Sequence, residues 1–300
     1  MRVLFCTDPL LPRSPDRAFA PEVAAADAAG LAWSCCDFEA LVGGDVGAAL
    51  RRVPASERIE VAIYRGWMMP LAAYDALHAG LLARGLQLVN DPAAHRSAHL
   101  LPAALPHLGD DTPATVVLPL AAGLEDSRIA AALAPFGARA LIVKDYVKSR
   151  KHEWNDACFI RAADDDAEVR RVVGNFLARQ GEDLVGGLVF RAYEPLVPLG
   201  NDPRSDMPLP REWRRFIADG RPLIESPAWE IADSIAPPEF TELARRVPCR
   251  FFSLDLAERA AGGWTAIELG DGQVAGLPPR MDPAQFYRAL AAWDPQPLAG

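Results

Sequence analysis

Short apolar runs alternate with segments of helical periodicity in the first third of the chain. The runs at residues 2–6 and 61–64 predict buried strands, and LAAYDALHAGLLARG repeats apolar residues at helical spacing before it ends at Gly85. Strands and helices in alternation are typical of an α/β lobe with a largely parallel sheet. The polar, turn-forming segment HLGDDTP comes next. We therefore expect an α/β domain over residues 1–108.

Two further segments follow with different patterns. Strand and helix signals continue through residues 109–186, which predicts a second lobe. The third segment, residues 187–300, is richer in strands, and EWRRFIADGRPLIES predicts a hairpin that turns at Asp219 and Gly220. The last two predicted strands are FFSLDLAER and WTAIELGDGQV. Since alternate strand residues face the same way, Asp255 and Glu268 can project from neighbouring strands into one cleft.

Charge and cysteine content narrow the class of protein. The formal net charge of -9 argues against nucleic acid or an anionic membrane as the main partner. No apolar run is long enough to cross a bilayer, and the opening run is too short for a secretory signal. The five cysteines form no CxxC pair, and an odd number leaves one without a disulfide partner, which suits a reducing compartment. We therefore expect a cytoplasmic protein.

Lysine is distributed unusually. The chain has 28 arginines and three lysines, and all three lysines, Lys144, Lys148 and Lys151, lie in KDYVKSRK. Lysine offers a compact charge on a flexible stem, which the planar guanidinium of arginine does not replace. Lys144 also ends the apolar run ALIV, where a charge is costly without a partner. The pattern predicts phosphate binding, with a solvated basic loop as the alternative that we favour for Lys148 alone.

The order of several segments adds a family resemblance. KDYVKSRKHEW, GGLVFRAYEPL, EWRRF and SLDLAERAAGGWTAIELGDGQV together resemble ATP-grasp carboxylate-amine ligases, especially a poorly characterised group of bacterial and phage-associated members. YRGWMM and LVNDP extend the resemblance into the first lobe. It implies the ATP-grasp fold, a mixture of α/β and α+β lobes in which two subdomains hold ATP and an N-terminal α/β pre-ATP-grasp domain faces the acceptor.

The same resemblance implies roles for residues around the nucleotide. Lys144 matches the strand lysine that contacts the α- and β-phosphates of ATP. Lys148 and Lys151 would belong to the mobile loop over the phosphates, which contains no glycine here. Tyr193 and Glu194 fall in the hinge strand beside the adenine, where Glu194 is a candidate contact to the ribose.

A magnesium site is also implied. Asp255 and Glu268 match the two acidic ligands on adjacent strands, and hard carboxylate oxygens suit Mg²⁺. The usual third ligand, an asparagine two residues after the glutamate, is replaced by Gly270, so we expect Asp271 to take its place. From spacing alone, we would favour salt bridges between solvent-facing strand residues for Asp255 and Glu268; the lysine cluster upstream leads us to favour metal.

Three arginines are further candidates. Arg191 and Arg214 lie in apolar strands, and we expect them to bind the γ-phosphate or an acyl phosphate, with surface salt bridges as an equal alternative. Arg65 follows the VAIY strand, and ligands in open α/β sheets bind at such strand ends, so it is a candidate for holding an acceptor carboxylate. We interpret the helical pair His95 and His99 as part of an ordinary helix face.

The predicted function is that of an ATP- and magnesium-dependent ligase. It would activate a small-molecule or peptide carboxylate as an acyl phosphate for attack by an amine. The signatures GxxxxGK[ST], GxGxxG, GxSxG and HExxH are absent from the sequence. Two alternatives stay open: a non-catalytic ATP-binding protein, suggested by Gly270 and the unusual phosphate loop, and a phosphotransferase acting on another group.

Overall fold

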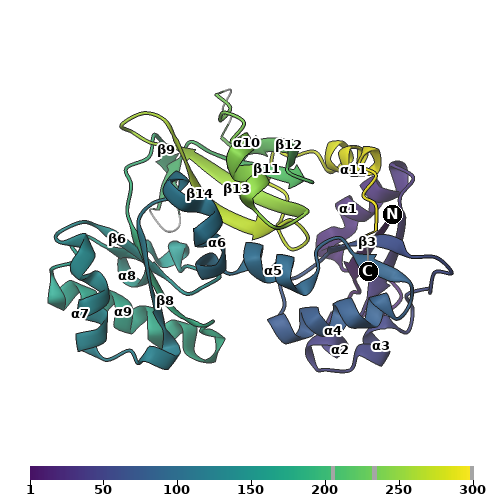
Figure 1. Ribbon diagram of the computed structural model, residues 1–300, viewed down its shortest axis with the longest axis horizontal. Helices are drawn as coiled ribbons and strands as arrows, with labels where there is room; N and C mark the ends of the chain where they lie inside the picture. The colour runs from purple at the N-terminus through teal and green to yellow at the C-terminus, as the bar shows by residue number, and fades with distance from the viewer. Residues whose placement is uncertain (204–206, 232–234, 298–300) are drawn as a thin grey trace.

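Three four-stranded sheets with helices against them make up the molecule (Figure 1). The computed structural model describes residues 1–203, 207–231 and 235–297. No helix in these ranges is long and apolar enough to cross a membrane. The structure combines α/β and α+β parts, which confirms the fold class that the sequence predicts.

The first sheet has the order β2-β1-β3-β4, and every pairing in it is parallel. This confirms the parallel sheet that the sequence predicts. Its strands are β1 (Arg2–Cys6), β2 (Ala32–Cys36), β3 (Glu60–Arg65) and β4 (Leu86–Leu88), and its helices are α1 (Ala20–Ala28), α2 (Phe38–Val42), α3 (Val46–Leu50) and α4 (Leu71–Leu82). Two more helices, α5 (Pro92–His99) and α6 (Leu101–Leu108), lead to the other sheets (Figure 1).

The second sheet is antiparallel in the order β5-β8-β6-β7. Its strands are β5 (Thr115–Pro119), β6 (Leu141–Lys144), β7 (Phe159–Ile160) and β8 (Gly187–Ala192), and its helices are α7 (Asp126–Leu133), α8 (Trp154–Ala157) and α9 (Asp166–Gln180). The boundary that we expected at residue 187 assigned β8 to the third part of the chain. The strand belongs to the second sheet, because it forms ladders with β5 and β6 there.

The third sheet is antiparallel in the order β12-β11-β13-β14. Its strands are β11 (Glu212–Ala218), β12 (Arg221–Pro227), β13 (Phe251–Glu258) and β14 (Trp264–Asp271). The predicted hairpin between β11 and β12 is confirmed, and Asp219 and Gly220 both have positive φ, at 45° and 73°. A separate hairpin pairs β9 (Pro198–Asn201) with β10 (Pro208–Pro210), and α10 (Thr241–Arg246) precedes β13.

The last helix returns to the first sheet. Helix α11 (Pro283–Ala292) lies against α1 and also packs on the third sheet, where the Phe286 ring lies 4.9 Å from that of Phe216 on β11 (Figure 1). Its Tyr287 hydroxyl donates a hydrogen bond of 2.8 Å to Glu22, and Phe286 is fully buried. The segment expected as one part over residues 187–300 therefore builds the third sheet and ends in a helix that joins this sheet to the first lobe.

Gly174 in the middle of α9 generates a stability prediction. No atom lies within 4 Å of the position that a Cβ would occupy there. Because glycine costs a helix interior about 0.5–1 kcal/mol relative to alanine, Gly174→Ala should raise the free energy of unfolding by about that amount. Gly80→Ala in α4 is the matched control with opposite sign, since its Cβ would lie 2.6 Å from Val46 and 2.8 Å from Leu50. Urea titration measures both, and a destabilised Gly174→Ala would contradict the structure.

Candidate functional site

Two cavities meet between the second and third sheets. The first has a volume of about 190 Å³ and the second about 320 Å³. Four residues line both of them: Lys144, Ser149, Lys151 and Glu268. Charged side chains from β6, the loop after it and β14 therefore stand where the cavities join.

The first cavity has an apolar wall suited to a planar ring. Ile142, Trp154, Tyr193 and Trp229 contribute to this wall. The Tyr193 ring meets the Trp154 ring edge-on at 6.0 Å between centroids, which fixes both side chains. Glu194 also lines the cavity.

The expected ribose contact is engaged within the protein. The Glu194 carboxylate accepts a hydrogen bond of 2.6 Å from Arg259 Nε. This ion pair joins the end of the hinge strand to the turn between β13 and β14. Glu194 therefore faces the cavity with one oxygen already bonded.

All three clustered lysines line these cavities. Lys144 and Lys151 line both, and Lys148 lines the second. Burial lowers the pKa of Lys144, although the Glu268 carboxylate opposes that shift. Lys151 Nζ lies 5.6 Å from the centroid of the Trp229 ring, within the range of a cation–π contact.

Asp145 shapes the glycine-free loop. Its Oδ1 accepts hydrogen bonds from the backbone N–H groups of Val147, at 2.7 Å, and Lys148, at 2.5 Å. Its Oδ2 accepts a bond of 2.8 Å from Gln180 at the end of α9. The turn that glycine would otherwise permit is thus held by a buried carboxylate.

Asp255 and Glu268 are direct neighbours across β13 and β14, as their positions in the sequence predict. Arg214 on β11 binds both oxygens of Asp255, at 2.8 Å from Nε and 2.6 Å from Nη2. Among the described residues, none donates a hydrogen bond to Glu268. Burial raises the pKa of Asp255 despite Arg214. The surrounding protein would raise the pKa of Glu268 too, but Lys144, Lys151 and other nearby cations lower it.

Asp271, the expected third ligand, lines the second cavity with Glu268, but its carboxylate is bonded to other residues. It is fully buried, and its carboxylate accepts hydrogen bonds from Asn90 Nδ2 at 2.8 Å and Gln273 N at 2.8 Å, and pairs with His95 Nδ1 at 2.7 Å. These three partners already engage both carboxylate oxygens, which leaves Asp271 poorly placed to bind a metal. Within the described ranges, no three carboxylate, histidine or cysteine side chains converge as a metal site.

Arg65 lies outside the two cavities. Only 1% of its surface is exposed, and its guanidinium pairs with Glu22 at 3.0 Å and donates to the carbonyls of Gly272, at 2.6 Å, and Ala275, at 2.7 Å. A buried charge needs such partners, and here they come from α1 and from the segment after β14. Arg65 ties the first sheet to the third, and its position does not fit the expected contact with an acceptor carboxylate.

Arg191 combines a place in the first cavity with a structural contact. Its guanidinium donates to the carbonyls of Ala266, at 3.0 Å, and Ile267, and to the Thr112 hydroxyl. Burial lowers its pKa to about 10, against the opposing effect of Glu268. It therefore connects β8 to β14 across the cleft and adds positive charge to it.

Two site residues escaped the sequence analysis. Glu212 on β11 lines the first cavity, and its pKa is raised to about 8 by burial and by Asp255. The sequence did offer a signal for Glu212. It lies two residues before Arg214 in the same strand, so both side chains face the same way. His99, interpreted from sequence as part of a helix face, lines the second cavity and stacks on His95 at 4.9 Å. Burial and His95 lower the pKa of His99 to about 4.

The raised pKa of Glu212 predicts a pH dependence of stability. Its pKa of about 8 in the folded protein exceeds the 4.5 of an exposed glutamate, so its contribution to stability is fully present below pH 4.5 and is lost as the pH rises through about 8. Glutamine cannot ionise. Between pH 5 and 8, wild type should therefore lose about 2–4 kcal/mol of unfolding free energy more than Glu212→Gln does. Urea titrations with a metal chelator measure this, and parallel pH profiles would contradict it.

A cleft between two subdomains is what the resemblance to ATP-grasp ligases implies. Comparison with known proteins shows that the chain is of the ATP-grasp class. A family model described as "ATP-grasp domain, R2K clade family 3" matches residues 135–290, more than half of the chain. The chain belongs to this family. No curated protein sequence matches it.

Solved structures with similar folds cover nearly the whole chain. D-cycloserine synthetase DcsG is 16% identical with a TM-score of 0.59, covering 97% of this chain and 99% of its own. A RimK domain ATP-grasp protein from Sphaerobacter thermophilus DSM 20745 is 16% identical with a TM-score of 0.58 and the same coverage of 97% and 99%. The ATP-grasp ligase PsnB, complexed with minimal precursor, Mg and ADP, is 14% identical with a TM-score of 0.56, covering 97% and 95%. These likenesses support the fold.

Proposed function

We propose that the protein is an ATP- and magnesium-dependent ligase that activates a carboxylate as an acyl phosphate for attack by an amine. The observation that carries this proposal is the pair of cavities that share Lys144, Ser149, Lys151 and Glu268. A phosphoryl transfer needs a nucleotide on one side and an acceptor on the other, with cations between them. The shared residues stand at that junction.

The first cavity is the nucleotide site in this proposal. The adenine lies against the apolar wall beside Tyr193, with Glu194 near the ribose. The phosphates extend toward Lys144 and Lys151, whose ammonium groups act as point charges on phosphate oxygens. Lys148 adds positive charge on the acceptor side, in the second cavity.

The cleft offers magnesium two carboxylates, those of Asp255 and Glu268. Mg²⁺ in nucleotide enzymes usually takes one or two carboxylates and completes its shell with phosphate oxygens and water. Glu268 offers oxygens that no described residue bonds. Both Asp255 oxygens accept from Arg214, but a carboxylate oxygen retains a second lone pair. Glu268 and Asp255 would therefore hold the ion, which when bound neutralises charge on the transferring phosphoryl group.

The residues of this chain then orient two successive steps. First, a carboxylate oxygen of the substrate attacks the terminal phosphorus of ATP, so that ADP leaves and an acyl phosphate forms. Second, the amine attacks the acyl carbon, a C–N bond forms, the C–O bond to phosphate breaks, and the amine loses a proton. Arg214 lines the acceptor cavity and Arg191 the nucleotide cavity, and we assign both the stabilisation of negative charge.

The acceptors are small-molecule or peptide carboxylates and amines in this account. The second cavity, of about 320 Å³, is lined by Met68, His99 and Lys148 besides the shared residues. DcsG is named a D-cycloserine synthetase, and PsnB was solved with a minimal precursor, Mg and ADP. Two proteins of similar fold are thus named as a synthetase and a ligase, which supports the proposed class of reaction.

The proposal is tested by ADP release from ATP and Mg²⁺ in the presence of pooled carboxylates and amines, with mass spectrometry of any product. An amide product whose formation requires both acceptors and ATP supports the ligase. ATP binding without turnover in every pool would instead favour a non-catalytic ATP-binding protein. A phosphorylated product with no new C–N bond would indicate a phosphotransferase.

Lysine chemistry at position 144 gives a sharp prediction. Lys144→Ala should weaken ATP binding by about ten-fold or more, equal to about 1.4 kcal/mol, because it removes a fixed cation next to the phosphates. Lys144→Arg should also bind ATP poorly, since a fork of different shape replaces the ammonium. Calorimetry with ATP and Mg²⁺ measures both.

Lys148→Arg is the matched control, since Lys148 is exposed and lines only the second cavity. It should bind ATP as wild type does. Unchanged ATP affinity in folded Lys144→Ala would overturn the assignment of the nucleotide site.

The magnesium site predicts a change in ligand-induced stability. Wild type should melt at a higher temperature with ATP and Mg²⁺ together, because a ligand that binds the native state stabilises it by mass action. Glu268→Gln should keep its melting temperature without ligand and lose most of that gain. Glu242→Gln on the exposed face of α10 should behave as wild type. Equal magnesium-dependent shifts in wild type and Glu268→Gln would show that β14 supplies no metal ligand.

A further inference from the structure

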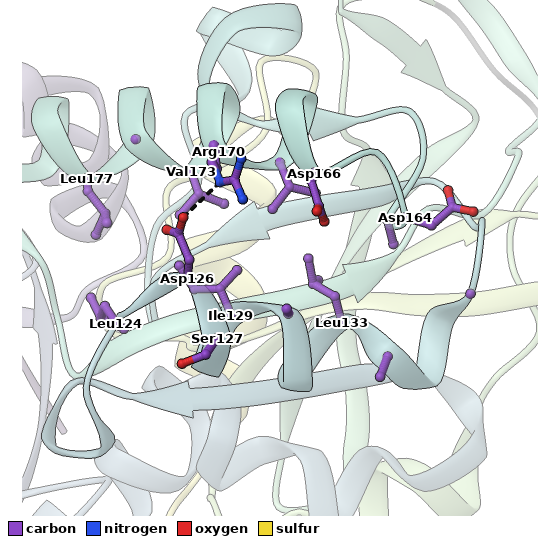
Figure 2. A pocket seen from close by; sticks show the side chains of 16 residues that line it. Leu124, Asp126, Ser127, Ile129, Leu133, Asp164, Asp166, Arg170, Val173 and Leu177 are labelled. Atoms are coloured by element: carbon purple, nitrogen blue, oxygen red, sulfur yellow. Dashed lines mark hydrogen bonds and ion pairs between the residues drawn. The ribbon is translucent and has the colours of Figure 1, made fainter.

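A third cavity lies between α7 and α9 on the second sheet (Figure 2). Its volume is about 680 Å³, larger than either cavity of the cleft. Apolar residues of both helices and their flanks line it, among them Leu124, Ile129, Leu133, Val173 and Leu177. A groove of this size accommodates a ligand of substantial volume.

The groove is separate from the cleft. None of the residues that line it lines either cleft cavity. On β6, Leu141 and Val143 belong to the core beneath α7 and α9, whereas Ile142 and Lys144 line the nucleotide cavity. Because alternate strand residues face opposite ways, the groove and the nucleotide cavity lie on opposite faces of this sheet.

The groove has room beside the backbone of α9. Gly174 lines it, and nothing lies within 4 Å of where its Cβ would be. Ala130 on α7 and Ala134 just after this helix line it as well, and both are exposed. Because the space beside Gly174 is open and both alanines are exposed, a second chain can approach the two helices closely.

One end of the groove is acidic and the other apolar. Asp164 and Asp166 lie at one end, whereas Leu124 and Leu177 lie at the other (Figure 2). No basic side chain in the described part of the chain pairs with Asp164 or Asp166. Neither is needed to cap α9, because Asp165 accepts the capping bonds from Ala167 and Glu168.

An ion pair crosses the groove between its two ends. Arg170 of α9 and Asp126 of α7 are 2.8 Å apart, and the pair is exposed. It neutralises the charge of Asp126, so the net negative charge of the rim is concentrated at Asp164 and Asp166. A cationic group is the complement of that end.

We propose that the α7–α9 groove docks a short segment of a partner protein with a lysine or arginine at one end and apolar side chains along one face. The basic group pairs with Asp164 and Asp166, and the apolar face packs over Gly174 and Leu177. Helix α7 has eight residues and is about 12 Å long, so the groove accommodates about two turns of a helix. The chain's net charge of -9 also favours a basic partner over an acidic one.

Selection from a random library of displayed 12-residue peptides tests this proposal on the intact protein. Gly174→Leu, which fills the groove at an exposed helix position, serves as the counter-target. Enriched peptides should carry a basic residue at one end and apolar residues along one face. A synthesised peptide should bind Gly174→Leu about ten-fold more weakly than wild type, as expected when a central contact is blocked. Gly174→Ala has a smaller side chain and should retain binding. It shows whether replacing the glycine in α9 affects binding when the groove stays open.

A double variant tests whether the acidic end of the groove is needed for peptide binding. Asp164→Asn combined with Asp166→Asn should weaken the same peptide and reduce the salt dependence of its binding. Enriched peptides without a basic residue, or binding that is equal in wild type and Gly174→Leu, would overturn the proposal. Self-association of wild type that Gly174→Leu abolishes would assign the groove to a second copy of this chain and would also overturn it.

Discussion

The arrangement of the cleft depends on one ion pair. Arg214 holds both oxygens of Asp255, which is 2% exposed, next to Glu268 on the following strand. Two carboxylates so close together would repel each other strongly where water is scarce, and Arg214 relieves that repulsion. Glu268 is then left as the anion that faces Lys144 and Lys151. This division of one paired and one unpaired carboxylate underlies our proposal of a magnesium–nucleotide site.

Buried polar contacts outside the cleft connect the three sheets. Arg65 links β3 to α1 and to the segment after β14, Asp271 links β14 to α5 through His95, and Arg191 links β8 to β14. Removing one partner of such a contact leaves an unpaired buried group, which costs more than the contact itself contributes. The same residue types that suggest ligand binding in a sequence therefore also serve as ties between parts of a fold.

Local patterns predicted much of this structure, and long-range partners explain the remainder. Periodicity indicated the parallel first sheet, the turn at Asp219 and Gly220, and the pairing of Asp255 with Glu268. The lysine cluster indicated the place where the cavities join. Nothing local reveals that β8 pairs with β5, or that α11 returns to α1, because these contacts join segments far apart in sequence. The sequence likewise did not show that Asp271 bonds to Asn90 and His95, because both partners are far from it along the chain.

The central claim is that ATP phosphates lie between Lys144 and Lys151, and the scarcity of lysine makes it directly measurable. Acetylation with an amine-reactive reagent, followed by mass spectrometry, reads each of the three lysines separately, with the exposed Lys148 as reference. Our account predicts that ATP with Mg²⁺ slows modification of Lys144 and Lys151 by about ten-fold, as expected for groups shielded by a bound ligand, and changes that of Lys148 much less. Equal modification of both lysines with and without ATP and Mg²⁺, at saturating concentrations, would contradict it.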